Sequence, residues 1–186
     1  FNIAQYPITI AQYEVFVHAE DGYRNPIWWD AKADSREWRS KNNSIALPAD
    51  SLGSDRPVEQ VAWFEAVAFC KWLAQRLNAP APNLPPMKIS LPTEAQWLRA
   101  AQGDNSRQYP WGDTFDTTRC NTIEQNIGRS TPVTQFPKGA SLYGVQDMSG
   151  NVFEMLLDSH AEPEYRGIRG GSWKTDAKRA NLTYRE

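Results

Sequence analysis

Residues 91–103 read LPTEAQWLRAAQG, and this stretch decides how the middle of the chain folds. Thr93 and Gln96 form a capping box, in which the Thr hydroxyl accepts a hydrogen bond from a backbone N–H and the Gln side chain reaches back. Gly103 is placed to end the helix, because glycine readily adopts the left-handed conformation that follows a last helical turn. The pattern predicts a helix from Thr93 to about Ala101.

A longer helix is predicted upstream, over residues 61–77. Glu65 near its start suits the helix dipole, and four prolines between residues 80 and 86 end it. A third, shorter helix is expected over residues 8–18. The predicted apolar stripe of the long helix consists of Phe64, Val67, Ala68, Lys71, Trp72 and Leu77, with Cys70 and Leu73 on its flanks.

Between the helices predicted at residues 8–18 and 61–77, residues 21–55 show no sustained hydrophobic periodicity and are expected to form a long ordered loop. Trp28 and Trp29 are predicted to anchor this loop from within, since buried indole rings supply large apolar contacts. Beyond Gln102 the frequent glycines indicate turns and short strands. YPWG at residues 109–112 is predicted to be a structural turn with a buried Trp111, and RGGSW at 169–173 to be scaffold.

Composition limits the classes of function. The chain has 186 residues and a net charge of −2, which favours neither a nucleic-acid partner nor an anionic membrane. No apolar run reaches the ~20 residues of a membrane span. We expect one α+β domain over residues 1–186, cut from a longer protein since the chain does not begin with Met. Cys70 is expected to be a buried free thiol, which points weakly to a reducing, cytoplasmic location.

The order of the motifs carries a family resemblance. PVEQVAWFEAVAFCKWL at residues 57–73 precedes the 91–103 stretch; YPWG, TPVTQFPKGASLYGVQDMSGNVFEM at 131–155 and RGGSW follow it. This series resembles the formylglycine-generating-enzyme, or sulfatase-modifying-factor, family. The resemblance implies a C-type-lectin-like fold with two main helices, short antiparallel strands and much irregular structure. The family's closing Gly-Phe-Arg strand is missing before Glu186, so further residues are expected beyond it.

The resemblance also implies an oxidase centre that this sequence does not reproduce. Oxidase members carry a cysteine pair shortly after RGGSW, whose thiolates bind Cu(I), a soft-ligand arrangement. Residues 174–186 contain no Cys, and no copper is expected. A related branch uses non-haem iron with several histidines, but the sequence has only His18 and His160. No catalytic residue is therefore assigned, and the chain is predicted not to be an enzyme.

Structural calcium is the cofactor that the resemblance implies. In the stretch 147–154, Asp147 and Glu154 would supply carboxylates, and Gly150 and Val152 would supply carbonyls, all oxygen donors that calcium prefers. The alternative is a calcium-free hairpin in which Glu154 caps backbone N–H groups. A second set is formed by Asn121, Thr122 and Glu124, with an Asx turn at Asn121 as its alternative.

The stretch after RGGSW is the predicted ligand surface. In the variable proteins of diversity-generating retroelements, a branch of this family, the matching region faces solvent and is diversified. Polar residues and Tyr suit recognition surfaces, although an ordinary polar surface is the alternative. The predicted ligand contacts are Trp173, Lys174, Thr175, Asp176, Lys178, Asn181, Thr183 and Tyr184.

These features predict a non-catalytic ligand-recognition module. It would be either a retroelement variable protein or a sensor fused to an effector domain, with a protein, peptide or glycan as ligand. A metal-dependent oxidase related to the formylglycine-generating enzyme is the alternative from another class. A purely structural assembly module is the third.

Overall fold

The computed structural model describes residues 1–29, 33–42, 54–79, 85–160 and 162–186, with the side chains of residues 33–36 and 159–164 left out of the description. None of the helices in these ranges is long and apolar enough to cross a membrane. The contacts divide the chain into two compact units. The elements are α1 (Ile10–His18), α2 (Ala33–Lys41), α3 (Trp63–Asn78), α4 (Glu94–Gln102), β1 (Glu154–His160) and β2 (Glu162–Arg169), with short 3₁₀ turns between them.

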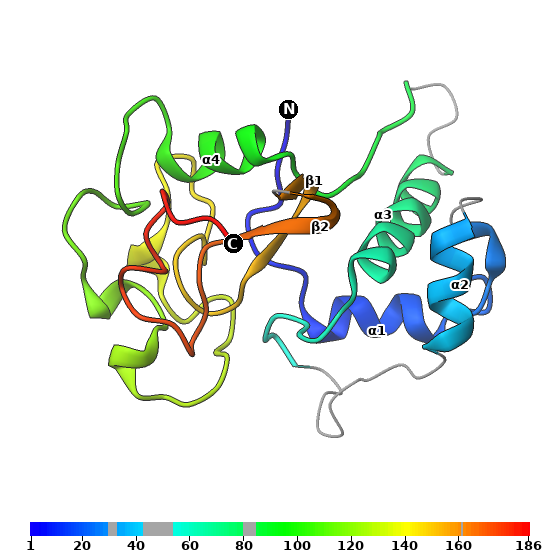
Figure 1. The fold of residues 1–186 in the computed structure, drawn as a ribbon, viewed down its shortest axis with the longest axis horizontal. Coiled ribbons are helices and arrows are strands. Elements are labelled where there is room, and N and C mark those ends of the chain that lie inside the picture. The colour runs from blue at the N-terminus through cyan, green and yellow to red at the C-terminus, as the bar shows by residue number, and fades with distance from the viewer. Residues whose placement is uncertain (30–32, 43–53, 80–84, 161) are drawn as a thin grey trace. The chain divides into compact units, whose positions relative to one another are not determined.

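The first unit comprises Phe1–Thr9, Asp55–Pro57 and Pro92–Glu186. Strands β1 and β2 of this unit pair antiparallel (Figure 1). Glu154 lies opposite Arg169, and the register shifts twice along the pair. The last residue extends this pair, because the Ile168 and Glu186 backbones exchange hydrogen bonds of 2.8 and 3.3 Å. The rest of the unit is mostly turns, as the sequence predicts.

Helix α4 begins and ends where the sequence places it. The Thr93 hydroxyl accepts from the Gln96 amide at 3.2 Å, and the Gln96 side chain accepts from the Thr93 amide at 2.9 Å. Gly103 follows the helix with φ of +71°. The buried face of α4 packs in the core of the first unit, which contains Trp97, Ala100, Ala101, Val145, Met148, Leu156 and Leu182.

The second unit comprises Ile10–Ser54 and Val58–Leu91. Helix α1 contacts α3 (Figure 1). Aromatic side chains of the two helices pack against each other in the core of the unit. The Phe16 ring is completely buried and lies 5.4–5.7 Å, between ring centroids, from four other aromatic rings. These four rings belong to Tyr13, Tyr23, Phe69 and Trp72.

The buried face of α3 differs from the predicted stripe. The helix buries Glu65, Ala68, Phe69 and Trp72, whereas Phe64 is only partly buried and Leu77 is 48% exposed. The burial of Glu65 explains the difference. Its carboxylate accepts from the Tyr23 hydroxyl at 2.6 Å and from the Ala62 amide at 2.7 Å, so a charged residue occupies an inward position that the sequence pattern assigns to solvent.

The predicted loop at 21–55 is partly helical, because residues 33–41 form α2; residues 43–53 lie outside the described part of the chain. The prediction that two tryptophans anchor this region is confirmed. Both are buried, and their indole N–H groups donate to backbone carbonyls, that of Trp28 to Asp21 at 2.5 Å and that of Trp29 to Tyr23 at 3.0 Å.

Candidate functional site

The chain after β2 forms a loop whose start is tightly packed. Gly171 has φ of +73°, and a Cβ atom there would lie 2.8 Å from the Thr175 hydroxyl and 2.9 Å from the Ala180 Cα. The Thr175 hydroxyl accepts from the Ser172 amide at 2.8 Å and donates to the Ser172 carbonyl at 3.0 Å. Thr175, predicted as a ligand contact, is thus buried and supports the loop from inside.

Two further side chains shape the middle of the loop. The Asp176 carboxylate accepts from the Arg179 amide at 3.0 Å. The Asn181 side-chain oxygen accepts from the Thr183 amide at 2.9 Å and from the Thr183 hydroxyl at 2.8 Å. Such side-chain-to-backbone bonds fix turns where no helix or strand does so.

Arg169 holds the end of the loop. Its guanidinium is buried and donates to the Leu182 carbonyl at 2.8 Å and to the Tyr184 carbonyl at 2.9 Å. Its other terminal nitrogen forms an ion pair with Glu94, which also pairs with Arg185 at 3.1 Å. The RGGSW motif is scaffold, as predicted. Its first residue, Arg169, binds backbone carbonyls of the loop.

The segment 108–124 braces the loop from the other side. The Leu182 amide donates to the Gln108 carbonyl at 2.8 Å, and the Tyr109 hydroxyl donates to the Ala177 carbonyl at 3.1 Å. The carboxylate of Glu124, which is also a predicted calcium ligand, accepts from the Ala177 amide at 2.8 Å.

The remaining predicted ligand residues of this loop differ in their solvent exposure. Between residues 174 and 178, the exposed side chains carry charges of both signs. Lys174, Asp176, Lys178 and Thr183 are exposed, and Trp173, Asn181 and Tyr184 are partly buried. The Lys174 ammonium lies 4.5 Å from the centroid of the Trp173 ring, so this indole already receives a cation.

A buried polar network lies beneath the predicted calcium loop. Asn151 is completely buried; its side-chain N–H donates to Asp147 at 2.8 Å, and its side-chain oxygen accepts from Asn121 at 3.2 Å. The Asn121 side-chain oxygen has no hydrogen-bond partner among the described residues. Asn121 is therefore linked to Asp147 through Asn151, so one residue of the second predicted calcium set shares a network with the first.

Glu154 is partly buried and lies near enough to this network for Asp147 to affect its pKa. Its carboxylate accepts from the Trp97 indole N–H at 2.7 Å. Burial raises the pKa of Glu154 to about 8; repulsion from Asp147 adds to the rise, and the indole bond opposes it. Burial likewise raises the pKa of Asp147 to about 7, against the effect of the Asn151 hydrogen bond. Two carboxyl groups that are largely removed from water, with one side-chain donor each, favour either a proton or a bound cation.

The donor set suits calcium better than copper or iron. The oxygens of Asp147, Glu154 and Asn121 are hard ligands, and Gly150 allows the turn with φ of +84°. Within the described ranges, no group of three His, Cys, Asp or Glu side chains could hold a metal ion. His18 is exposed, and the side chain of His160 falls outside the description. These residues do not fit a copper or iron centre, and no metal step is assigned to them.

Comparison with known proteins identifies the family. The family model described as the sulfatase-modifying factor enzyme 1-like domain matches residues 1–186. The chain belongs to this family. Treponema denticola variable protein 1 has a similar structure, with a TM-score of 0.63 and 22% identity over 97% of this chain and 76% of that one. The predicted fold, C-type-lectin-like in the subtype of this family, is thereby confirmed.

Relatives of this sulfatase-modifying-factor domain include an enzyme. Hercynine oxygenase from Mycolicibacterium thermoresistibile is 27% identical over 95% of the chain and 45% of its own length. The inactive Cα-formylglycine-generating enzyme 2 of Bos taurus is 33% identical over 79% of the chain and 47% of its own length. The chain thus spans about half the length of these curated relatives.

The similarity to hercynine oxygenase overturns one prediction. The missing cysteine pair was the reason to predict that the chain is not an enzyme, yet a relative aligned over 95% of the chain is named as an oxygenase. That inference was wrong because it considered only two kinds of centre, a copper site made by a cysteine pair and an iron site made by several histidines. The absence of one ligand set says nothing of other chemistry on the same fold.

Proposed function

We propose that this domain belongs to an oxygenase related to hercynine oxygenase, and that the loop at 173–184 forms part of its substrate-binding surface. The observation that carries the proposal is the contrast within this loop. Its backbone is held by buried groups, chiefly Arg169 and Thr175, while charged side chains of both signs face solvent. A fixed frame lowers the entropic cost of binding a polar ligand.

The charges of this loop suit a small zwitterionic substrate. Lys174 and Lys178 are cationic, and Asp176 between them is anionic. The Trp173 ring receives the Lys174 ammonium in the free chain, and a quaternary ammonium group of the substrate would take the place of that ammonium. Hercynine is a betaine with one quaternary ammonium and one carboxylate. The loop offers an aromatic ring and an acidic side chain for the first charge, and lysines for the second.

Binding and turnover are tested with the whole protein that carries this domain, because no group of three His, Cys, Asp or Glu side chains among the described residues could hold the iron. Calorimetric titration measures hercynine binding, and an oxygen electrode follows oxygen uptake with Fe(II), hercynine and a thiol. Lys174→Ala and Lys178→Ala are each expected to weaken hercynine binding about 3- to 5-fold, or ~1 kcal/mol. Lys88→Ala, an exposed lysine in the second unit, is the matched control. Absence of both binding and oxygen uptake would sink the proposal.

A recognition role without oxygenase chemistry is the second candidate. The similarity in fold to Treponema denticola variable protein 1 and the exposed loop side chains favour it. Sequencing the gene and its flanks separates the two: a nearby copy of the codons from about Gly170 onward, differing only at adenines, would indicate a diversified receptor. Binding of other ligands without oxygen uptake would point the same way.

We also propose that Asp147 and Glu154, with Gly150, Val152 and the Asn121 side-chain oxygen, hold a structural calcium ion. Support comes from the oxygen donors and from the unpartnered Asn121 oxygen. Calcium would offset the repulsion between the two carboxylates. It would stabilise the turn that leads into β1, and no catalytic part is assigned to it.

A further inference from the structure

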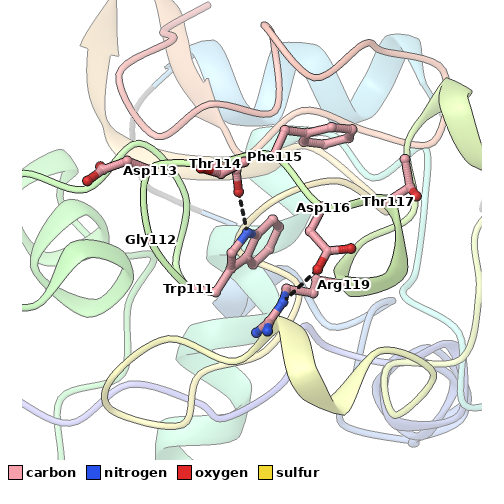
Figure 2. Close-up of a pocket in the computed structure, with 8 residues that line it drawn as sticks. All are labelled: Trp111, Gly112, Asp113, Thr114, Phe115, Asp116, Thr117 and Arg119. Atoms are coloured by element: carbon pink, nitrogen blue, oxygen red, sulfur yellow. Dashed lines mark hydrogen bonds and ion pairs between the residues drawn. The ribbon is translucent and has the colours of Figure 1, made fainter.

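A pocket of about 530 Å³ lies outside the proposed substrate surface, and residues 111–117 with Arg119 line it (Figure 2). Its volume falls within the ~300–1,000 Å³ typical of small-molecule sites. The sequence predicts a buried Trp111 in a purely structural turn, but the side chain is only partly buried and borders this pocket.

The aromatic wall of the pocket is rigid before any ligand arrives. The Trp111 indole N–H donates to the Thr114 carbonyl at 3.0 Å, which fixes the ring plane (Figure 2). The Tyr109 ring stacks on the indole with centroids 5.5 Å apart and planes inclined by 11°. Phe115 packs against the same tyrosine at 5.5 Å. Because the buried Tyr109 covers the indole, Trp111 needs no reorganisation to serve as a stacking platform.

A preoriented donor stands at the edge of this platform. The Arg119 Nε donates to the Asp116 carboxylate at 3.0 Å, and its Nη1 donates to the Lys138 carbonyl at 2.7 Å. Asp116 is itself held by the Thr118 amide at 2.8 Å. Arg119 Nη2 forms no hydrogen bond within the described part of the chain, so it remains able to donate to a ligand in a fixed direction.

The lining combines aromatic faces with a majority of polar groups. Two carboxylates, from Asp113 and Asp116, and one guanidinium leave a small net charge, which favours a neutral ligand over a strongly ionic one. A pyranose has this character. Its C–H face fits the electron-rich face of an indole, and its ring hydroxyls can pair with threonine hydroxyls, carboxylates and the guanidinium.

We propose that this pocket binds a neutral pyranose sugar, with Trp111 as the stacking platform and Arg119 as the orienting donor. The proposal does not rest on the oxygenase function, since no residue of the pocket belongs to the loop at 173–184. A peptide with Pro or an aromatic residue could also pack on the aromatic rings, but it would leave the polar groups that line the pocket without hydrogen-bond partners.

Indole N–H resonances of the ¹⁵N-labelled chain give a direct test. The probes are the methyl glycosides of glucose, galactose, mannose and N-acetylglucosamine, each at about 10 mM because isolated sugar contacts are weak, with Kd near 1 mM. Trp111→Phe assigns the Trp111 signal. At least one glycoside is expected to shift that signal in a saturable way and to leave the Trp97 signal, which arises from the core, unmoved.

Substitutions at other pocket residues test the proposal even if the Trp111 variant does not fold. Arg119→Gln and Thr117→Ala are expected to weaken the glycoside about 5-fold or more, while Thr134→Ala, an exposed threonine outside the pocket, leaves binding unchanged. The proposal is overturned if no glycoside moves the Trp111 signal, if Arg119→Gln and Thr117→Ala bind as well as the parent chain, or if only Pro-rich peptides produce the shift.

Discussion

Buried carboxyl groups occur in both compact units, and their surroundings differ. In the second unit, Glu65 accepts from the Tyr23 hydroxyl and from the Ala62 amide at the start of α3. In the first unit, Asp147 and Glu154 each receive one side-chain donor and repel one another. The first arrangement is a completed structural element, whereas the second has capacity left for a proton or a cation.

The largest expected effect concerns pH. The pKa values of Asp147 and Glu154 rise from 3.8 and 4.5 to about 7 and about 8 on folding. The folded state therefore binds more protons between about pH 4 and 8. Stability is greatest below the ordinary pKa values and falls as pH rises through the folded ones.

In the presence of chelator, thermal unfolding should show a loss on the order of 3–5 kcal/mol between pH 5 and 8.5. The double variant Asp147→Asn/Glu154→Gln should give a much flatter profile. An equally steep profile in that variant would mean that other groups cause the dependence.

Breaking the completed arrangement should have the next largest effect. Glu65→Ala leaves the Tyr23 hydroxyl and the Ala62 amide without their acceptor in a buried place, which costs ~2–4 kcal/mol. Denaturant unfolding measures this loss. Glu65→Gln is the matched control, because it keeps one acceptor oxygen and should lose less than half as much. Equal stability of Glu65→Ala and the parent chain would contradict the role given to Glu65.

Calcium should act on the first unit and depend on the carboxylate pair. After chelation at pH 8, adding calcium to about 100 times its Kd should stabilise the chain by ~2.7 kcal/mol, or roughly 5–11 °C in Tm. Glu154→Gln should abolish the rise, and Glu65→Gln should preserve it. A rise that survives Glu154→Gln would place the cation elsewhere.

Substitutions of solvent-exposed side chains in the loop at 173–184 should have the smallest effect on stability. Lys174→Ala and Lys178→Ala should each change the free energy of unfolding by less than ~0.5 kcal/mol, because both side chains are exposed. Thr175→Val, which removes the hydroxyl that bonds Ser172, should cost ~1–2 kcal/mol. Equal losses at the three positions, measured by denaturant unfolding, would show that the loop has no distinct frame.

Local patterns predicted the elements whose stabilising contacts lie within a few residues. The Thr93 capping box and the Gly103 stop are confirmed, since a cap depends on groups three or four positions apart. The anchoring role of Trp28 and Trp29 is confirmed as well, because their indole partners lie six or seven residues away. Helix α2 was missed: its sequence, ADSREWRSK, has no apolar stripe to predict it.

Predictions that depended on distant partners did less well. Glu124 accepts from the Ala177 amide, 53 residues away, which the sequence did not predict, and its part in a metal site stays a prediction. Thr175 turns inward because Ser172 and the close approach at Gly171 hold it there. The rotation of the buried face of α3 depends on Tyr23, 42 residues from Glu65.

The sequence by itself determined the family, the positions of the main helices and the absence of the copper-binding cysteine pair. Short motifs and the identity of single residues are enough to predict these features. Only the tertiary structure decided which residues of the loop at 173–184 face solvent, that Asn121 shares a network with Asp147, and that Trp111 borders a pocket. The reason is that burial and hydrogen-bond partnership arise between segments far apart in the chain, and no local pattern records which distant group will supply the partner.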